Sequence, residues 1–273
     1  MCVRVVTVVQ ARTTSTRLPG KVLRPVLGRP LLALQLERVL AADHVGTVVV
    51  ATTTEPADDP ICDVADEVGV PAVRGSRDDL LDRHLVAARA HDAEAVVKIP
   101  SDCPLIDPAV IDLVLGEFLA EPGRWDYVSN LHPATWPDGH DTEVMPMTVL
   151  EAAGREADRP FEREHTTPFI WERPERFRCH NVVMPDGRDL SMTHRWTIDY
   201  PEDLAFVTAV YEALGHDPAW GVPEVLGLLD DRSDIAALNA GLAGVNWYRH
   251  HLDELTTVDA GATRLHPDDG GAS

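Results

Sequence analysis

A polar loop with three positive charges occupies residues 10–23, which read QARTTSTRLPGKVL and follow an apolar run. Its cations are Arg12, Arg17 and Lys21, with hydroxyl side chains and a glycine between them. Backbone N–H groups, hydroxyls, Lys and Arg are the donors that bind phosphate oxygens, so the loop is a candidate triphosphate site. It matches neither G-x-x-x-x-G-K-[ST] nor G-x-G-x-x-G, and a basic surface loop without a ligand is the alternative.

The charge distribution sets this loop apart from the rest of an acidic chain. The 273 residues include 45 Asp or Glu and 24 Lys or Arg, for a formal net charge of -21. The first 36 residues nevertheless contain six Lys or Arg and no Asp or Glu. One polyanionic ligand would account for this concentration of positive charge. A DNA or RNA partner is disfavoured, because a long polyanion would have to overcome the field of the whole protein.

Two aspartates that follow predicted strands are candidates for a metal site. Asp102 lies just beyond the predicted strand 93–99, and Asp199 ends the predicted strand 193–198. Both are expected at the ligand-binding edge of a parallel sheet, where Mg²⁺ would take a few carboxylates together with phosphate oxygens and water. Helix capping is the alternative role for each. If the pair binds Mg²⁺, Asp→Asn is expected to remove most turnover and to leave the stability nearly unchanged.

Apolar periodicity predicts alternating strands and helices over the first part of the chain. The strands are expected at 3–9, 45–52, 70–73 and 93–99, and the helices near 30–42, 58–68, 79–91 and 107–121. Runs of β-branched residues such as VRVVTVV are typical of strands buried on both faces of a parallel sheet. The βαβαβαβ order predicts an α/β fold with a Rossmann-like, three-layer α/β/α sheet.

The alternation breaks after a further predicted strand at 125–130. The next segment, 131–198, is predicted to be an inserted lobe with strands near 177–183 and 193–198 and helices near 148–157 and 162–172. Because no flexible linker precedes it, residues 1–255 are predicted to form a single domain, in which a helix resumes at 201–214. Residues 256–273 lack an apolar face and are predicted to be a disordered tail.

Cysteine, histidine and hydropathy patterns exclude several other classes. The four cysteines show no C-x-x-C spacing and the 12 histidines form no H-E-x-x-H pair, so a disulfide framework and a zinc site are disfavoured. The sequence contains no apolar run of about 18 residues and no secretory signal pattern, so a cytoplasmic protein without a membrane partner is expected.

The loop and five further motifs together resemble a known family. In chain order they are STRLPGK, RGSRDDLLDR (74–83), SDCPLIDP (101–108), PDGHDTEV (137–144), EREHTTPFI (162–170) and TIDYPEDL (197–204). They resemble the sugar nucleotidyltransferases that make CMP-activated sugar acids, the 3-deoxy-manno-octulosonate and acylneuraminate cytidylyltransferases. The resemblance is most pronounced for their relatives of spore-coat polysaccharide biosynthesis, and it spans residues 3–214.

This resemblance implies a Mg²⁺-dependent transfer of CMP from CTP to a hydroxyl of a sugar acid or related acidic acceptor, with release of pyrophosphate. It assigns catalysis to Arg12, Lys21, Asp102 and Asp199, of which Asp102 and Asp199 hold the metal. It assigns nucleotide binding to Ala11, Arg12, Ser15, Arg17, Lys21, Arg74, Ser76, Asp79 and Ser101. It assigns acceptor binding to Asp138, His140, Asp141, Glu143, Glu164 and His165. A homodimer paired through the inserted lobe is expected, and no residue is indicated as a general base.

One departure from the family bears on the choice of base, and three alternative functions remain open. Where the manno-octulosonate enzymes have a Gln that reads cytosine and then a Gly, this chain has Pro100 and Ser101, so the base is less firmly indicated than the phosphates. The first alternative is a nucleotide-sugar glycosyltransferase of the same sheet type. Such an enzyme would usually carry a D-x-D motif, whereas the SDC sequence of this chain provides one Asp. A non-catalytic CTP sensor is the second alternative. The third is a cytidylyltransferase whose acceptor is a phosphonate or a phosphate.

Overall fold

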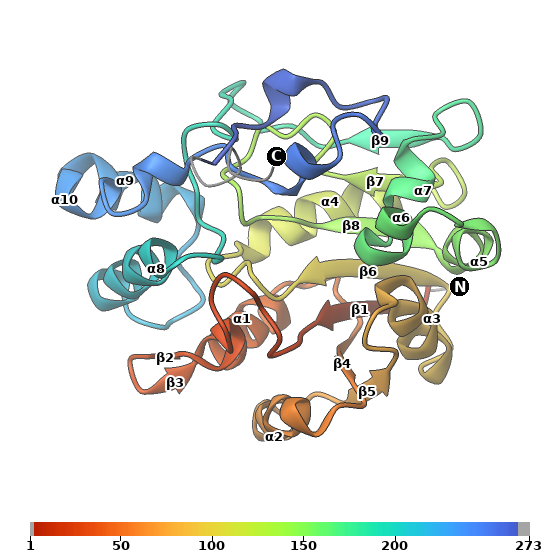
Figure 1. Ribbon diagram of the computed structural model, residues 1–273, viewed down its shortest axis with the longest axis horizontal. Helices are drawn as coiled ribbons and strands as arrows, with labels where there is room; N and C mark the ends of the chain where they lie inside the picture. The colour runs from red at the N-terminus through yellow and green to blue at the C-terminus, as the bar shows by residue number, and fades with distance from the viewer. Residues whose placement is uncertain (1–2, 267–273) are drawn as a thin grey trace, which may run out of the picture.

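A seven-stranded sheet forms the centre of the protein, whose computed structural model describes residues 3–266 (Figure 1). The strand order is β5-β4-β1-β6-β8-β7-β9. These strands are β1 (Val5–Gln10), β4 (Thr47–Thr53), β5 (Ala72–Gly75), β6 (Ala95–Pro100), β7 (Tyr127–Ser129), β8 (Glu143–Pro146) and β9 (Cys179–Asn181). Among the described strands of this sheet β8 alone runs antiparallel to its neighbours, β6 and β7, while β1, β4, β5 and β6 pair in parallel. A short ribbon of β2 (Pro25–Val26) and β3 (Arg29–Pro30) stands apart.

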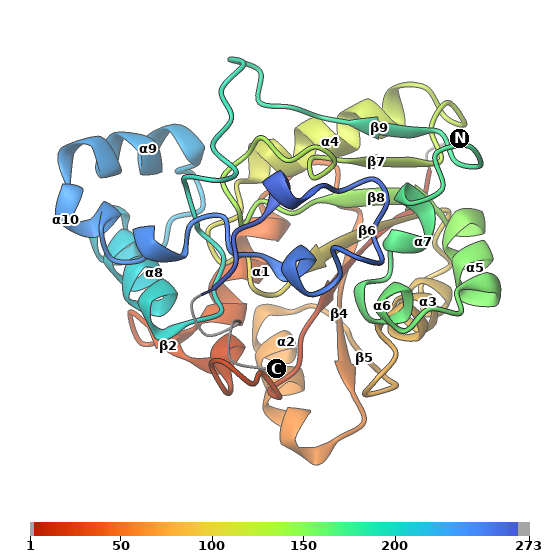
Figure 2. The ribbon, with the colours of Figure 1, turned by 45° about the horizontal axis from the view of Figure 1, so that its top comes forward.

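Helices cover both faces of this sheet, as Figures 1 and 2 show. One layer consists of α1 (Leu31–Leu40), α2 (Asp59–Val68) and α4 (Pro108–Ala120), and the other of α3 (Leu80–Ala90), α5 (Met147–Glu156), α6 (Pro160–His165) and α7 (Pro168–Trp171). Successive side chains of a strand point to opposite faces, so Val5 and Val9 of β1 pack with the first layer and Val6 and Val8 with the second. The predicted three-layer α/β/α fold is therefore confirmed.

A third apolar cluster lies beyond one end of the sheet. It is built by α8 (Pro201–Leu214), α9 (Val222–Asp231) and α10 (Ser233–Ala236), which pack with the start of α1. In Figure 1 these three helices extend to the left of the sheet. Within residues 3–266 no helix has both the length and the apolarity needed to cross a bilayer.

The segment 131–198 differs from its prediction in three places. Its strands β8 and β9 belong to the main sheet, and β8 lies in the sheet interior between β6 and β7. The helix expected at 162–172 is two helices, because Thr166 has a positive φ of 72° and a proline follows it at the start of α7. The strand expected at 193–198 is an extended segment with a single bridge, from Asp138 to Arg195.

The end of the described chain also differs from its prediction. Residues 256–266 pack against the domain instead of forming a tail without contacts. The Glu172 carboxylate accepts hydrogen bonds from the N–H groups of Thr256 and Thr257 at 2.7 and 2.9 Å, and the Arg264 N–H donates to the Gly244 carbonyl at 2.8 Å. Sequence reasoning missed these contacts because they are polar and need no apolar stripe. The remainder of the predicted tail, 267–273, lies outside the described residues.

Candidate active site

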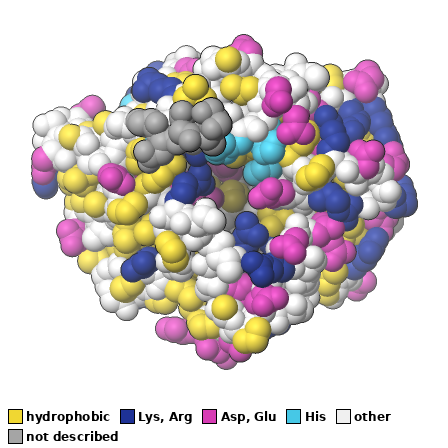
Figure 3. All heavy atoms as spheres, viewed as in Figure 1, with side chains coloured by type: hydrophobic (Ala, Val, Ile, Leu, Met, Phe, Trp, Pro, Cys, Tyr) yellow, Lys and Arg dark blue, Asp and Glu magenta, His cyan; other side chains and the backbone are white. Residues whose placement is uncertain are grey.

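The loop predicted to bind phosphates leaves β1 at the carboxyl edge of the sheet and lines a cavity of about 460 Å³. Figure 3 shows a hollow near the middle of this face, with Lys, Arg and His side chains around it. The cavity brings together most of the residues predicted to bind nucleotide or metal, namely Ala11, Arg12, Ser15, Arg17, Lys21, Ser101, Asp102 and Asp199. We refer to it as the nucleotide cavity.

A buried carboxylate holds the loop in place. Asp58 accepts hydrogen bonds from the N–H and the hydroxyl of Thr13 at 2.7 and 2.6 Å, and from the Thr53 hydroxyl at 2.5 Å. Burial would raise the pKa of Asp58, but these donors outweigh burial and lower it. The loop is therefore tied to the neighbouring strand β4 by an ionised group that the sequence pattern did not indicate.

Lys21 joins the two predicted metal ligands. Its Nζ lies 3.1 Å from Asp102 Oδ2 and 2.8 Å from Asp199 Oδ1, and it donates to the Ile198 carbonyl at 2.8 Å. Arg17 Nη2 lies 2.7 Å from the other Asp199 oxygen. The two carboxylates therefore converge on one point beside the loop, although they come from opposite halves of the chain.

The capping interpretation fails for both aspartates. Helix α4 is capped by Asp107, which accepts from the Ala109 N–H at 2.8 Å, and α8 begins after Tyr200. Asp102 and Asp199 instead face the cavity and its cations.

Opposite charges control protonation in this cluster. Burial disfavours the charged form of Lys21, but the carboxylates of Asp102 and Asp199 outweigh it and raise the pKa of the ammonium group. Burial would likewise raise the pKa of Asp199, and the charges of Lys21 and Arg17 overcome this effect and lower it. Lys21 and Asp199 are therefore both charged at neutral pH.

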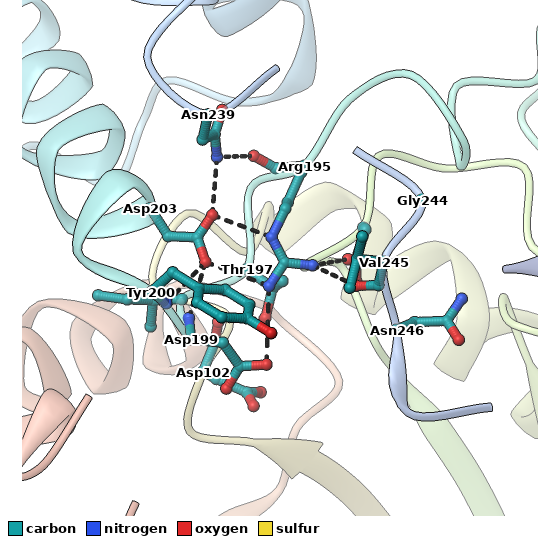
Figure 4. A network of polar contacts seen from close by, with 12 residues as sticks. Asp102, Arg195, Thr197, Asp199, Tyr200, Asp203, Asn239, Gly244, Val245 and Asn246 are labelled. Carbon is teal, nitrogen blue, oxygen red and sulfur yellow. Dashed lines mark hydrogen bonds and ion pairs between the residues drawn. The ribbon is translucent and has the colours of Figure 1, made fainter. Parts of the chain in front are cut away.

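A buried arginine that sequence reasoning missed positions Asp199 (Figure 4). The Arg195 side chain is 1% exposed and pairs with Asp203 at 2.9 Å and with Asp138 at 3.2 Å, and it donates to the Val245 carbonyl. Asp203 in turn accepts the N–H groups of Asp199 and Tyr200 at 2.9 and 3.0 Å. Burial opposes the charge of Arg195, and Asp138 and Asp203 overcome it and raise the pKa. The sequence did contain one signal for this arginine. Alternate residues of an extended segment point to the same side, so residues 195, 197 and 199 were expected to share one side of their segment.

A second cavity of about 670 Å³ adjoins the first. Of the residues predicted to bind the acceptor, Asp138, His140, Asp141, Glu143 and His165 line it, whereas Glu164 lines the nucleotide cavity. The residues that line both cavities are Lys98, Asp138, Asp141, His165, Asn246 and Trp247. We refer to the larger space as the acceptor cavity, and the shared residues mark its boundary with the nucleotide cavity.

Glu143 forms a buried ion pair in the acceptor cavity. Its carboxylate, on β8, pairs with Lys98 of β6 and accepts the Tyr127 hydroxyl at 2.5 Å. Burial favours the neutral acid, but Lys98 overcomes it and lowers the pKa of Glu143. Glu143 therefore already has partners for both oxygens, and the free donors and acceptors of this cavity lie elsewhere.

Three residues predicted near the base do not line either cavity. Arg74 Nη2 pairs with Asp59 at 2.5 Å. Asp79 accepts the Asp82 N–H at 2.9 Å as the cap of α3 and pairs with Arg163 at 2.5 Å, while the Ser76 hydroxyl accepts the Asp79 N–H at 3.2 Å. These contacts are structural. The next arginine of the same motif, Arg83, lines the nucleotide cavity and was missed.

Comparison with known proteins supports this geometry. The sequence model of the family described as cytidylyltransferase matches residues 6–216. The chain belongs to the cytidylyltransferase family. It is therefore a nucleotidyltransferase of a family that transfers CMP from CTP, which removes the glycosyltransferase and sensor alternatives.

Individual relatives agree with this membership. The chain is 29% identical to the spore coat polysaccharide biosynthesis protein SpsF of Bacillus subtilis, over 84% of this chain and 95% of the relative. It is 37% identical to the 3-deoxy-manno-octulosonate cytidylyltransferase of Trichlorobacter lovleyi, over 44% of this chain and 47% of the relative. The structure of a cytidylyltransferase from Leptospira borgpetersenii superposes with a TM-score of 0.81 at 32% identity, covering 86% of this chain and 97% of that one.

The match to the family ends at residue 216, yet later residues of this cytidylyltransferase complete both cavities. Asn246 and Trp247 line both, and Tyr248 and Asp259 line the acceptor cavity. The Trp247 ring stacks on His165 with centroids 3.8 Å apart. The segment was not indicated as functional by the sequence, because its motif-free composition contained no signal.

Proposed function

We propose that the protein transfers CMP from CTP to a hydroxyl of a small acidic acceptor, a sugar acid, with Mg²⁺ as the metal and pyrophosphate as the second product. The observation that carries this proposal is the convergence of Asp102 and Asp199 on Lys21, beside a cationic loop at the edge of the sheet. The name of the T. lovleyi relative supports a sugar acid as the acceptor.

The cations of the nucleotide cavity suit a triphosphate. Arg12, Arg17 and Lys21 come from the loop, and Arg83 comes from α3. Arg83 is held by hydrogen bonds to the carbonyls of Ser76 and Arg77 at 2.6 and 3.0 Å. We assign these four side chains to the phosphates and to the charge of the departing pyrophosphate, because such transfers depend mainly on positioning and charge neutralisation.

The carboxylates fit a hard divalent cation. Asp102 and Asp199 already place oxygens around one positive charge, and no described group of three or more His, Cys, Asp or Glu forms a complete protein cage. Mg²⁺ is commonly held by one or two carboxylates together with substrate phosphates and water. The metal would neutralise charge on the α-phosphate. Lys21 and Arg17 would then shift toward the phosphates as their carboxylate partners take up the metal.

The proposed step is an in-line displacement. The acceptor oxygen forms a bond to the α-phosphorus, the bond from the α-phosphorus to the bridging oxygen breaks, and pyrophosphate leaves with that electron pair. The hydroxyl proton passes to water or to a carboxylate at the boundary of the cavities. Arg195 and Asp203 hold the backbone of Asp199 in position for this step.

The test is an assay of acceptor-dependent pyrophosphate release. The protein is incubated with CTP, Mg²⁺ and pooled sugar acids, with parallel reactions that lack acceptor or metal, or that replace CTP by ATP, GTP or UTP. We expect release only with CTP, Mg²⁺ and acceptor together. Tight binding of CTP without release in any pool would contradict the proposal.

A further inference from the structure

Acidic side chains outnumber basic ones in the described lining of the acceptor cavity. Lys98 is the only Lys or Arg among its described lining residues. Five carboxylates line the same space, those of Asp138, Asp141, Glu143, Asp189 and Asp259. Glu143 neutralises Lys98, and Arg195 from outside the lining pairs with Asp138. Asp141, Asp189 and Asp259 therefore have no paired cation in the part of the chain that the structure describes; Asp189 and Asp259 are exposed, whereas Asp141 lies at the boundary of the two cavities.

Three of the four histidines that line the cavity do not supply positive charge, and the fourth, His180, lies 3.6 Å from the carboxylate of Glu117. Burial lowers the pKa of His132 and of His140 to about 4, and that of His165 to about 3. These three rings are neutral at pH 7. The cavity therefore offers an anionic group no positive partner other than Lys98, which Glu143 already neutralises.

Among the acidic side chains of the acceptor cavity, Asp141 is the one most affected by the shortage of cations. It lies at the boundary of the two cavities, and within residues 3–266 its side chain accepts no hydrogen bond. Burial raises its pKa well above the usual value, and the charges of Asp138 and Asp102 add to the effect, so Asp141 favours the neutral acid as long as no cation lies beside it. A donor carrying positive charge would relieve both the missing hydrogen bonds and the repulsion.

A buried histidine lacks a donor in the same cavity. His140 is 1% exposed, and its Nδ1 lies 3.2 Å from the Pro137 carbonyl, which fixes the proton on that nitrogen. Its Nε2 is then an acceptor, and it has no hydrogen-bond partner among the described residues. A buried acceptor left unpaired is costly, but this atom has almost no exposed surface, so by itself it does not indicate a ligand.

Aromatic side chains form much of the remaining wall. They are Tyr127, Trp136, Trp171, Trp247 and Tyr248, half of the Trp and Tyr residues of the chain. Aromatic rings combined with carboxylates are the surroundings in which proteins bind ammonium groups, through cation–π attraction and charge-assisted hydrogen bonds. Neutral hydroxyls alone would not supply the positive charge that favours the ionised form of Asp141.

We propose that the acceptor carries an ammonium group, which binds in the acceptor cavity against Asp141 and the aromatic wall, while its nucleophilic oxygen faces the nucleotide cavity. This inference rests on the proposed CMP transfer, which requires the nucleophilic oxygen of the acceptor to face the nucleotide cavity. It narrows the expected acceptor from an acid in general to a sugar acid that carries an amino group, or to another zwitterion with an acidic end and an amino end.

The test compares acceptors that differ only in the amino group. The pairs are 8-amino-3,8-dideoxy-manno-octulosonate with 3-deoxy-manno-octulosonate, and 2-aminoethylphosphonate with 2-hydroxyethylphosphonate. Binding is measured by calorimetry at pH 7.5 with Mg²⁺ and a non-cleavable CTP analogue filling the nucleotide cavity. The wild-type protein is compared with Asp141→Asn and with Asp253→Asn, which changes an exposed carboxylate outside both cavities.

We expect the amino member of at least one pair to bind tenfold or more tightly than its hydroxyl partner. Asp141→Asn should reduce this preference at least threefold, and Asp253→Asn should retain it. Equal affinity, tighter binding of the hydroxyl member, or no binding of either member in both pairs would overturn the inference, as would a preference that Asp141→Asn leaves intact. Pyrophosphate release from CTP is measured in parallel. An amino preference without any release would contradict the CMP transfer alone, whereas release without an amino preference would contradict the ammonium site alone.

Discussion

Replacing Asp199 by Asn separates structural from catalytic roles of the carboxylate cluster. Asp199 accepts hydrogen bonds from Lys21 at 2.8 Å and from Arg17 at 2.7 Å, and Arg195 lies 3.6 Å from it. Asparagine has nearly the same shape but no charge. It retains one oxygen acceptor and presents an amide donor to the other cation, so one of the two contacts is lost and the other is weakened.

The expected loss of stability follows from these contacts. The Asp199 side chain is 18% exposed and that of Lys21 12%, so their pair is largely shielded from water, whereas Arg17 is 35% exposed and contributes less. A hydrogen bond to a charged group contributes about 1.5–3 kcal/mol, and the discount for Arg17 leaves a cost of about 2 kcal/mol for the substitution. This corresponds to a fall in Tm of roughly 4–8 °C for a chain of this size. The expectation from sequence, a nearly unchanged stability, did not include these cations.

The difference in stability between wild type and Asp199→Asn should depend on pH. The pKa of Asp199 is lowered in the folded protein, because Lys21 and Arg17 outweigh the effect of burial. A group with a lowered folded pKa stabilises the protein above its unfolded pKa of about 3.9, and this contribution disappears as the pH falls through the folded value. The two proteins should therefore differ most at neutral pH and converge below about pH 4.

Activity provides the second measurement. If Asp199 holds Mg²⁺, Asp199→Asn should reduce CTP-dependent pyrophosphate release by at least about a hundredfold at saturating Mg²⁺, since a metal contributes several kcal/mol to the transition state. Thermal unfolding and turnover are measured on the same preparations, with Asp253→Asn as a control that should change neither. Turnover close to that of wild type would refute the metal assignment. A Tm unchanged at pH 7 would refute the argument from ion pairs.

Three further predictions concern the phosphate loop, Arg195 and the oligomeric state. Lys21→Ala and Arg17→Ala should each weaken CTP binding by about tenfold to a hundredfold in equilibrium measurements, and wild-type affinity in both variants would exclude the loop from phosphate binding. Arg195→Met should lower the free energy of unfolding in urea by about 3–5 kcal/mol, because it leaves the carboxylate of Asp203 buried without its partner, whereas Arg188→Met at an exposed pair should have little effect. The protein should be a homodimer in light scattering at micromolar concentration, and a monomeric mass would contradict this.

The sequence by itself determined the layers of the fold and the place of the site. Runs of β-branched residues and helical stripes are local patterns, and each strand expected before residue 100 is present within a few residues of its predicted bounds. Because parallel strands end at one edge of a sheet, this order was sufficient to predict that the loop after β1 and Asp102 lie together. The family resemblance added the prediction that Asp102 and Asp199 bind metal and that Asp138 and Asp141 bind the acceptor.

Tertiary structure decided which polar groups meet and which remain unpaired. Lys21 contacts Asp102 across 81 residues and Asp199 across 178, and no periodicity encodes such pairs. The same holds for the Arg195 and Asp203 pair and for Trp247, whose segment reaches the cavities only after the chain has passed around the sheet. Arg74 and Asp79 belong to a recognisable motif but do not line the cavities. Their side chains instead form ion pairs, Arg74 with Asp59 and Asp79 with Arg163. Apolar patterning specifies how elements pack, whereas the pairing of charges depends on the final distances between them, and these exist only in the folded protein.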